Sequence, residues 1–166
     1  MAALTGDETL YNHYFNRARA DGGRGGRGGD AFGFRVGLAF FPDSVLTKRT
    51  LEFATSPEVR TQDSPTILAV LMSRPWAARD AWEHIKTHWD DLQKTGTFMG
   101  LRTIIRSTND LCDRPTRDDI ARFFLETGRT TANERLGRQS LETIDRCIAM
   151  RDYQSAALSD FLKSTK

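Results

Sequence analysis

Apolar residues recur at three- and four-residue intervals along most of the chain, and this spacing constrains the fold more than any other feature. Such intervals place apolar side chains on one face of a helix. Proline, glycine and capping residues interrupt the pattern repeatedly, which gives about nine helical segments with short connections. No stretch shows the strict alternation of a strand. The sequence therefore predicts an all-α protein of antiparallel helix hairpins, stacked side by side as in an α-solenoid.

Capping residues predict several helix boundaries. Asp7, Ser44 and Asp63 each precede a helical pattern, and short polar side chains at such positions accept hydrogen bonds from the first free amides of a helix. Thr116 and Asp119 have the spacing of a capping box. These residues predict the first turns of four helices.

A segment rich in glycine and arginine interrupts the pattern at residues 21–30. It contains six glycines and two arginines, and so much glycine cannot hold a helix. We therefore divide the chain into a first helix at 1–20, a flexible loop at 21–30 and a helical-repeat domain at 31–166. RNA binding by the two Arg-Gly-Gly steps is disfavoured, because no aromatic residues are interleaved with them.

Charge and cysteine content limit the classes of function. The net charge of +2 gives no general electrostatic case for binding nucleic acid or an anionic membrane. No apolar run approaches the ~20 residues that span a bilayer, and the start "MAALTGDETLYNHYF" lacks the features of a secretion signal. Cys112 and Cys147 fit reduced thiols in a cytoplasmic protein, although two cysteines could also pair.

The stretch "AWEHIKTHWDDL" carries two histidines four residues apart, as in the H-E-x-x-H zinc signature. A zinc peptidase of that type needs a glutamate directly after the first histidine to activate the metal-bound water. Ile85 occupies that position, and the glutamate, Glu83, precedes His84 instead. The third ligand would be a glutamate at the position of Ser107. The motif therefore disfavours a zinc site built on His84 and His88.

A packing helix is the better interpretation of the same stretch. Trp82, Ile85, Trp89 and Leu92 fall at the spacing of one buried stripe on a helix over 77–94. The two histidines lie beside that stripe, so we expect the second to border the core and the first to face water.

Four motifs follow one another at intervals that resemble a known family. They are "SPEVRTQDSP" (56–65), "DAWEHIKTHWDDL" (80–92), "DIARFFLETG" (119–128) and "ANERLGRQSLETI" (132–144). Together they resemble the end of the C-terminal helical domain of zinc aminopeptidases, the gluzincin metallopeptidases of the aminopeptidase N and puromycin-sensitive type. The resemblance covers about residues 38–162.

The resemblance implies a right-handed bowl of HEAT-like helix pairs, of which this chain would be the last part. In that family the bowl caps the active-site cleft and walls a chamber that admits peptides. The implied partners are the zinc catalytic domain of the same enzyme and peptide substrates, with zinc as the cofactor of the parent enzyme. The zinc ligands and the G-x-M-E-N motif are absent from the sequence. We therefore expect no catalytic or metal-binding residue in this chain, and no activity from it alone.

A stand-alone α-solenoid that binds a protein partner on a concave face is the alternative function. An upstream zinc domain in the same reading frame would favour the peptidase, whereas an independent start signal would favour the interaction module.

Motif residues have a functional and a structural interpretation. Arg60, Gln62 and Asp63 match the family's R-x-Q-D, either as a chamber-facing polar patch or, as we favour, as a helix cap with hydrogen bonds that fix a turn. Arg135 and Glu142 match the last motif, where we favour ion pairs that lock neighbouring hairpins. Trp82 and Trp89 are structural in either interpretation.

One further residue is a candidate for binding substrate. Arg74, in "MSRPWAARDAW", precedes the tryptophan helix. The resemblance implies a chamber-facing basic residue in this turn, where it could meet the C-terminal carboxylate of a peptide. A solvated loop arginine is the simpler alternative.

Overall fold

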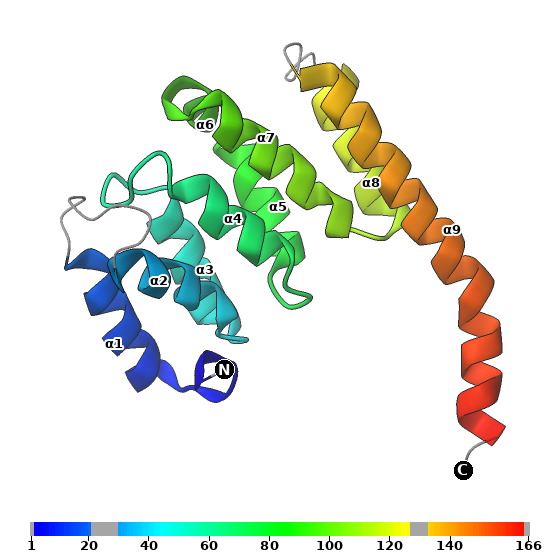
Figure 1. Cartoon of the computed structure of the whole chain (residues 1–166), viewed down its shortest axis with the longest axis horizontal. Helices are drawn as coiled ribbons and strands as arrows, with labels where there is room; N and C mark the ends of the chain where they lie inside the picture. Colours follow the sequence, from blue (N-terminus) through cyan, green and yellow to red (C-terminus); the bar gives the residue numbers. More distant parts are fainter. Residues whose placement is uncertain (1, 21–29, 127–132, 165–166) are drawn as a thin grey trace. The chain divides into compact units, whose positions relative to one another are not determined.

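The structure is a computed structural model that describes residues 2–20, 30–126 and 133–164, and these residues form α-helices and short 3-10 or π turns without a strand (Figure 1). The prediction of an all-α fold is confirmed. The α-helices are α1 (Glu8–Arg19), α2 (Asp30–Gly37), α3 (Ser44–Ala54), α4 (Ser64–Met72), α5 (Ala78–Thr87), α6 (Trp89–Thr95), α7 (Phe98–Ser107), α8 (Arg114–Ala121) and α9 (Glu134–Ser164). Most of the glycine-rich loop, residues 21–29, lies outside the described residues.

The chain divides into two compact units, Met1–Ser107 and Thr108–Lys166. In the first unit α4 is the central helix and contacts α2, α3, α5 and α7. Its sequence "SPTILAVLM" is apolar on nearly every side, as a helix enclosed by neighbours must be. Ile67, Leu68, Leu71 and Met72 are all buried to at least 99%. The apolar run therefore forms the core around which the other helices of the first unit pack.

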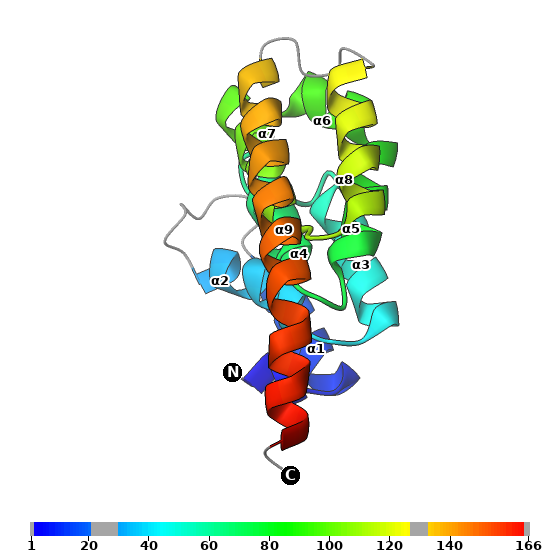
Figure 2. The ribbon, with the colours of Figure 1, turned by 90° about the vertical axis from the view of Figure 1, so that its right-hand side faces the viewer.

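The second unit is a hairpin of α8 and α9, which lie side by side in Figure 2. A π-helical turn at Arg122–Glu126 extends α8, and the expected apolar face of Ile120, Phe123 and Phe124 is buried. The 31 residues of α9 make it about 46 Å long at 1.5 Å per residue. From Ala149 onward its described side chains are exposed, so only its first half belongs to the core of the hairpin.

Two of the expected helix caps lie at other residues. Asp7 caps α1 as predicted, since its carboxylate accepts a hydrogen bond from the Leu10 amide. The cap of α3 is Asp43 instead of Ser44, and the cap of α8 is Asp113 instead of Thr116. In both cases an aspartate one or three residues upstream satisfies the first amides, which places the predicted residue inside the helix.

The predicted single helix over 77–94 is two helices in the structure. The backbone turns at His88, where φ is −101° and ψ is 9°, so α5 ends and α6 begins. The buried stripe nevertheless crosses the turn intact. Trp82, Ile85, Trp89 and Leu92 are at most 8% exposed, which confirms the packing interpretation of the tryptophans.

The expectation of reduced thiols is wrong. Cys112 and Cys147 form a disulfide across the α8–α9 hairpin, with Cα atoms 5.7 Å apart. Their separation of 35 residues hides this proximity in the sequence, because only hairpin closure brings them together. The cysteines therefore give no support for a cytoplasmic location. No helix among the described residues has both the length and the apolar character needed to cross a membrane.

Candidate functional site

The R-x-Q-D motif forms a buried ion cluster at the start of α4. Asp63 is fully buried, and its Oδ2 accepts hydrogen bonds from Arg35 Nη1 at 3.0 Å and from Arg60 Nε at 3.2 Å. Arg35 is itself only 2% exposed and donates from Nε to the carbonyl of Ala18 at the end of α1. Gln62 is exposed. The cluster thus connects α1, α2 and the start of α4.

This arrangement corrects the expected capping role of Asp63, whereas the hydrogen bonds between Arg60 and Asp63 do lie in the turn before α4. The residue occupies the N-cap position of α4, but its side chain makes no capping hydrogen bond. A buried guanidinium needs a buried carboxylate, since an unpaired charge in the core costs several kcal/mol. Arg35, which the motif does not contain, therefore decides where the Asp63 carboxylate points. The position of Arg35 as the only charged residue in the apolar stretch "AFGFRVGLAFF" could have predicted that it is buried.

Arg74 lies in the turn between α4 and α5, as expected. Its guanidinium stacks on the Phe40 ring, 4.3 Å from the centroid, and the residue is half-buried. Its Nε is buried and has no hydrogen-bond partner among the described residues. Its carbonyl accepts the amides of Ala77 and Ala78. The backbone of the turn is therefore fixed by hydrogen bonds, and the guanidinium packs on the Phe40 ring.

The two histidines stack on each other, with ring centroids 4.0 Å apart. His84 Nε2 forms a hydrogen bond with Thr55 Oγ1 at 3.0 Å, and His88 Nδ1 donates to the His84 carbonyl at 2.8 Å. His84 is half-buried rather than facing water, because α3 ends with Thr55 against it. Burial, and next the neighbouring His88, lowers the pKa of His84 to about 4, so this imidazole is neutral at pH 7.

Each of the two histidine rings uses one of its two nitrogens in a hydrogen bond within the fold, and Glu83, the nearest carboxylate in sequence, pairs with Lys86 at 2.9 Å. Within the described ranges no three His, Cys, Asp or Glu residues converge as metal ligands. The histidines act here as packing groups that fasten α5 to the end of α3.

A cavity of about 500 Å³ opens at the opposite end of α4 from Arg74. Its apolar walls come from Ala54, Val59, Pro65, Leu92 and Leu101, and its polar rim includes Arg60 and His88. Since Arg74 follows the last turn of α4 and the cavity borders its first turn, the structure does not bring Arg74 and Arg60 into one site.

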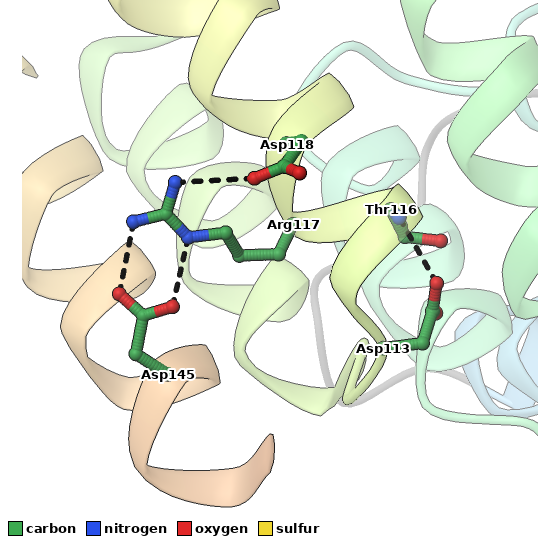
Figure 3. Close-up of polar contacts among 5 residues, drawn as sticks. All are labelled: Asp113, Thr116, Arg117, Asp118 and Asp145. Atoms are coloured by element: carbon green, nitrogen blue, oxygen red, sulfur yellow. Dashed lines mark hydrogen bonds and ion pairs between the residues drawn. The ribbon is translucent and has the colours of Figure 1, made fainter. Parts of the chain in front are cut away.

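In the second unit, Figure 3 shows that Arg117 binds Asp145 of α9 with two hydrogen bonds, 2.8 and 2.9 Å long, and also contacts Asp118. These bonds are the main cause that lowers the pKa of Asp145. Arg114 makes a second link from α8, to Asp152 at 2.6 Å. Arg117 and Asp145 lie just outside the four family motifs, so the motifs did not predict these links.

The two charged motif residues of α9, Arg135 and Glu142, do not take part in the ion pairs between α8 and α9. Arg135 is exposed. Glu142 is exposed as well and lies 3.9 Å from Arg146, one turn along the same helix. This ion pair of Glu142 therefore lies within α9 and does not join α9 to a neighbouring helix.

Comparison with known proteins agrees with this architecture. The profile of the family described as the ERAP1-like C-terminal domain matches residues 2–146. Aminopeptidase M1-A of Oryza sativa subsp. japonica is 34% identical over 109 residues, which cover 64% of this chain and 12% of that protein. Endoplasmic reticulum aminopeptidase 1 of Homo sapiens is 23% identical over 112 residues, 66% of this chain and 12% of that protein.

The match spans both units, from the first helix to the middle of α9. The chain is an all-α member of the ERAP1-like C-terminal domain family, the C-terminal domain of the M1 aminopeptidases. It spans only a small part of the length of these relatives.

Proposed function

We propose that this chain belongs to the C-terminal helical domain of a zinc-dependent aminopeptidase that removes N-terminal residues from peptides. The domain caps the active-site cleft and walls the substrate chamber as part of a HEAT-like solenoid. The catalytic zinc belongs to the catalytic domain of the parent enzyme, with which this domain would associate. The observation that carries the proposal is the family match over residues 2–146.

The geometry of Arg74 supports a role in holding substrate. Its guanidinium carbon lies over the Phe40 ring, 4.3 Å from the centroid, and its Nε has no hydrogen-bond partner among the described residues. A planar guanidinium fixed in this way pairs well with a carboxylate. In the proposed enzyme Arg74 therefore binds the C-terminal carboxylate of a peptide in the chamber.

Two assays test these roles. The purified 166-residue chain should not hydrolyse aminoacyl-coumarin substrates with or without added zinc, and zinc-dependent turnover would contradict the proposal. The second assay uses a chimera in which this chain replaces the matching region of the rice Aminopeptidase M1-A. The chimera should cleave short peptides and exclude folded proteins.

In that chimera, Arg74→Gln should raise KM for peptides with a free C-terminal carboxylate by about tenfold, since a charge-assisted hydrogen bond is worth roughly 1.5–3 kcal/mol. Peptides with an amidated C-terminus should be unaffected. Arg79→Gln, an exposed residue of α5, is the matched control. An equal change in KM for both peptide types would contradict the carboxylate-binding role.

A further inference from the structure

The disulfide of the second unit lies where solvent and small molecules reach it. Cys112 and Cys147 are both half-buried. A cavity of about 440 Å³ opens beside them, and its lining includes Cys112, Ile148, Arg151 and Ser155. Cys147 is not part of that lining. The cavity therefore opens beside Cys112 and not beside Cys147.

Two arginines and two aspartates line the cavity beside Cys112. Arg151 donates from Nη1 to the Cys112 carbonyl at 2.7 Å and forms no ion pair among the described residues. The acids of the cavity are engaged: Asp113 accepts the Thr116 amide as the cap of α8, and Asp152 pairs with Arg114. An anionic thiol that enters the cavity would therefore meet Arg151, a cation without a carboxylate partner in the described part of the chain, beside Cys112.

We propose that Cys112 is a site of reversible S-thiolation by small anionic thiols of the glutathione class. The thiolate attacks Cys112 Sγ from the cavity, and a new disulfide forms between the two sulfurs. The Cys112–Cys147 bond breaks, its electron pair leaves on Cys147 as a thiolate, and that thiolate takes a proton from water. One disulfide replaces another, so no further oxidant or reductant is required.

Exchange would release the start of α8 from α9. The Arg117–Asp145 and Arg114–Asp152 ion pairs and the hydrogen bond from Arg151 to the Cys112 carbonyl would then remain at this end of the hairpin. The Arg114–Asp152 pair is largely exposed, and exposed pairs stabilise little. The modification therefore changes the cohesion of this unit, a property that the proposed peptidase function does not require.

Peptide mapping tests the site. The oxidised, folded 166-residue chain is incubated with reduced glutathione, quenched with acid and digested with trypsin. Arg146 separates the two cysteines onto different tryptic peptides. We expect the glutathione adduct on Cys112 and a free thiol on Cys147. An adduct chiefly on Cys147, or no exchange without denaturant, would overturn the proposal.

A second experiment tests whether Arg151 attracts the anionic thiol. It measures the rate of exchange with glutathione and divides it by the rate with 2-mercaptoethanol, which has no carboxylate. Arg151→Gln should lower this ratio about threefold or more, and raised salt should lower it in the unchanged chain. Arg138→Gln is the control, since Arg138 is an exposed α9 residue paired with Glu134. An unchanged ratio in both Arg151→Gln and high salt would show that Arg151 does not recruit the thiol.

Discussion

The carboxylate of Asp63 illustrates how a single residue organises the first unit. It receives hydrogen bonds from Arg35 and Arg60, and Arg35 extends the cluster to the Ala18 carbonyl. Replacing a whole buried ion cluster with apolar residues can be neutral, but removing one partner leaves a charge stranded in the core. Asp63 therefore contributes to the stability of the first unit because it supplies the counter-charge of the buried Arg35.

The variant Asp63→Asn should destabilise the first unit by about 3 kcal/mol, because it leaves the buried Arg35 guanidinium without a counter-charge. The three tryptophans all belong to residues 76–89 of this unit, so urea unfolding followed by tryptophan fluorescence measures its stability. Asp91→Asn is the control, since Asp91 is 78% exposed in its pair with Lys94, and should cost less than about 0.5 kcal/mol. Equal losses for the two variants would contradict this account.

His84 should make the stability of the first unit fall on acidification. Its pKa is about 4 in the fold and 6.5 in the unfolded chain. The unfolded chain therefore binds more protons across this window, and stability decreases as the pH falls from 6.5 to 4. We expect a contribution of about 1 kcal/mol, a value reduced for the solvent that reaches this half-exposed ring.

His84→Gln should remove that contribution. The measurement is the change in unfolding free energy between neutral and acidic buffer, by tryptophan fluorescence, for the variant and the unchanged chain. Carboxylates titrate in both proteins, so the difference between the two isolates His84. The same pH dependence in both would show that the ring is protonated equally in the folded and unfolded states.

At the scale of elements, α7 packs closely on α4 because both carry small or compact residues where they meet. Gly100 is buried in the first turn of α7, and a Cβ placed on it would come within 2.7 Å of Pro65 Cγ. The proline ring lies in the first turn of α4 and cannot rotate away. This contact sets how near the two helices come.

A pair of glycine variants tests that packing. Gly100→Ala should destabilise the first unit by about 1–3 kcal/mol, because the added methyl group overlaps the Pro65 ring. Gly33→Ala, with no atom within 4 Å of the added Cβ in α2, should be neutral or stabilise by up to about 1 kcal/mol. Tryptophan fluorescence in urea measures both variants. An unchanged free energy of unfolding in Gly100→Ala would mean that α4 and α7 can move apart without loss of stability.

At the scale of the whole molecule, the two compact units are stabilised by different means. The first has a core of buried apolar side chains around α4. The second has fewer buried residues, and a disulfide joins Cys112, which precedes α8, to Cys147 of α9. A covalent link adds most where the core is small, because it restricts the unfolded chain.

Breaking the disulfide should therefore weaken the second unit selectively. For cysteines 35 residues apart, loop-closure entropy gives about 3–4 kcal/mol. Reduction or Cys147→Ser should lower the unfolding transition seen by far-UV circular dichroism, which detects both units. The transition seen by tryptophan fluorescence, which reports the first unit, should move little. The double variant Cys112→Ser/Cys147→Ser should be insensitive to reductant, and an equal shift in both signals would contradict selective weakening.

Local patterns predicted the elements well. The apolar spacing predicted helices, the tryptophan stripe predicted burial, and Asp7 was the cap expected of it. Helix ends were less predictable, since Asp43 and Asp113 compete with nearby Ser44 and Thr116 for the same amides. A sequence shows every residue able to cap, whereas backbone geometry selects one of them.

The sequence by itself determined the all-α class and the family, because helical periodicity and ordered motifs are properties of neighbouring residues. It did not determine the pairing of Asp63 with Arg35, the contact of His84 with Thr55 or the disulfide. Each of these joins residues at least 28 positions apart. Only tertiary packing decides which distant groups meet, because burial makes a charge or a thiol take the partner that the surrounding helices bring within reach.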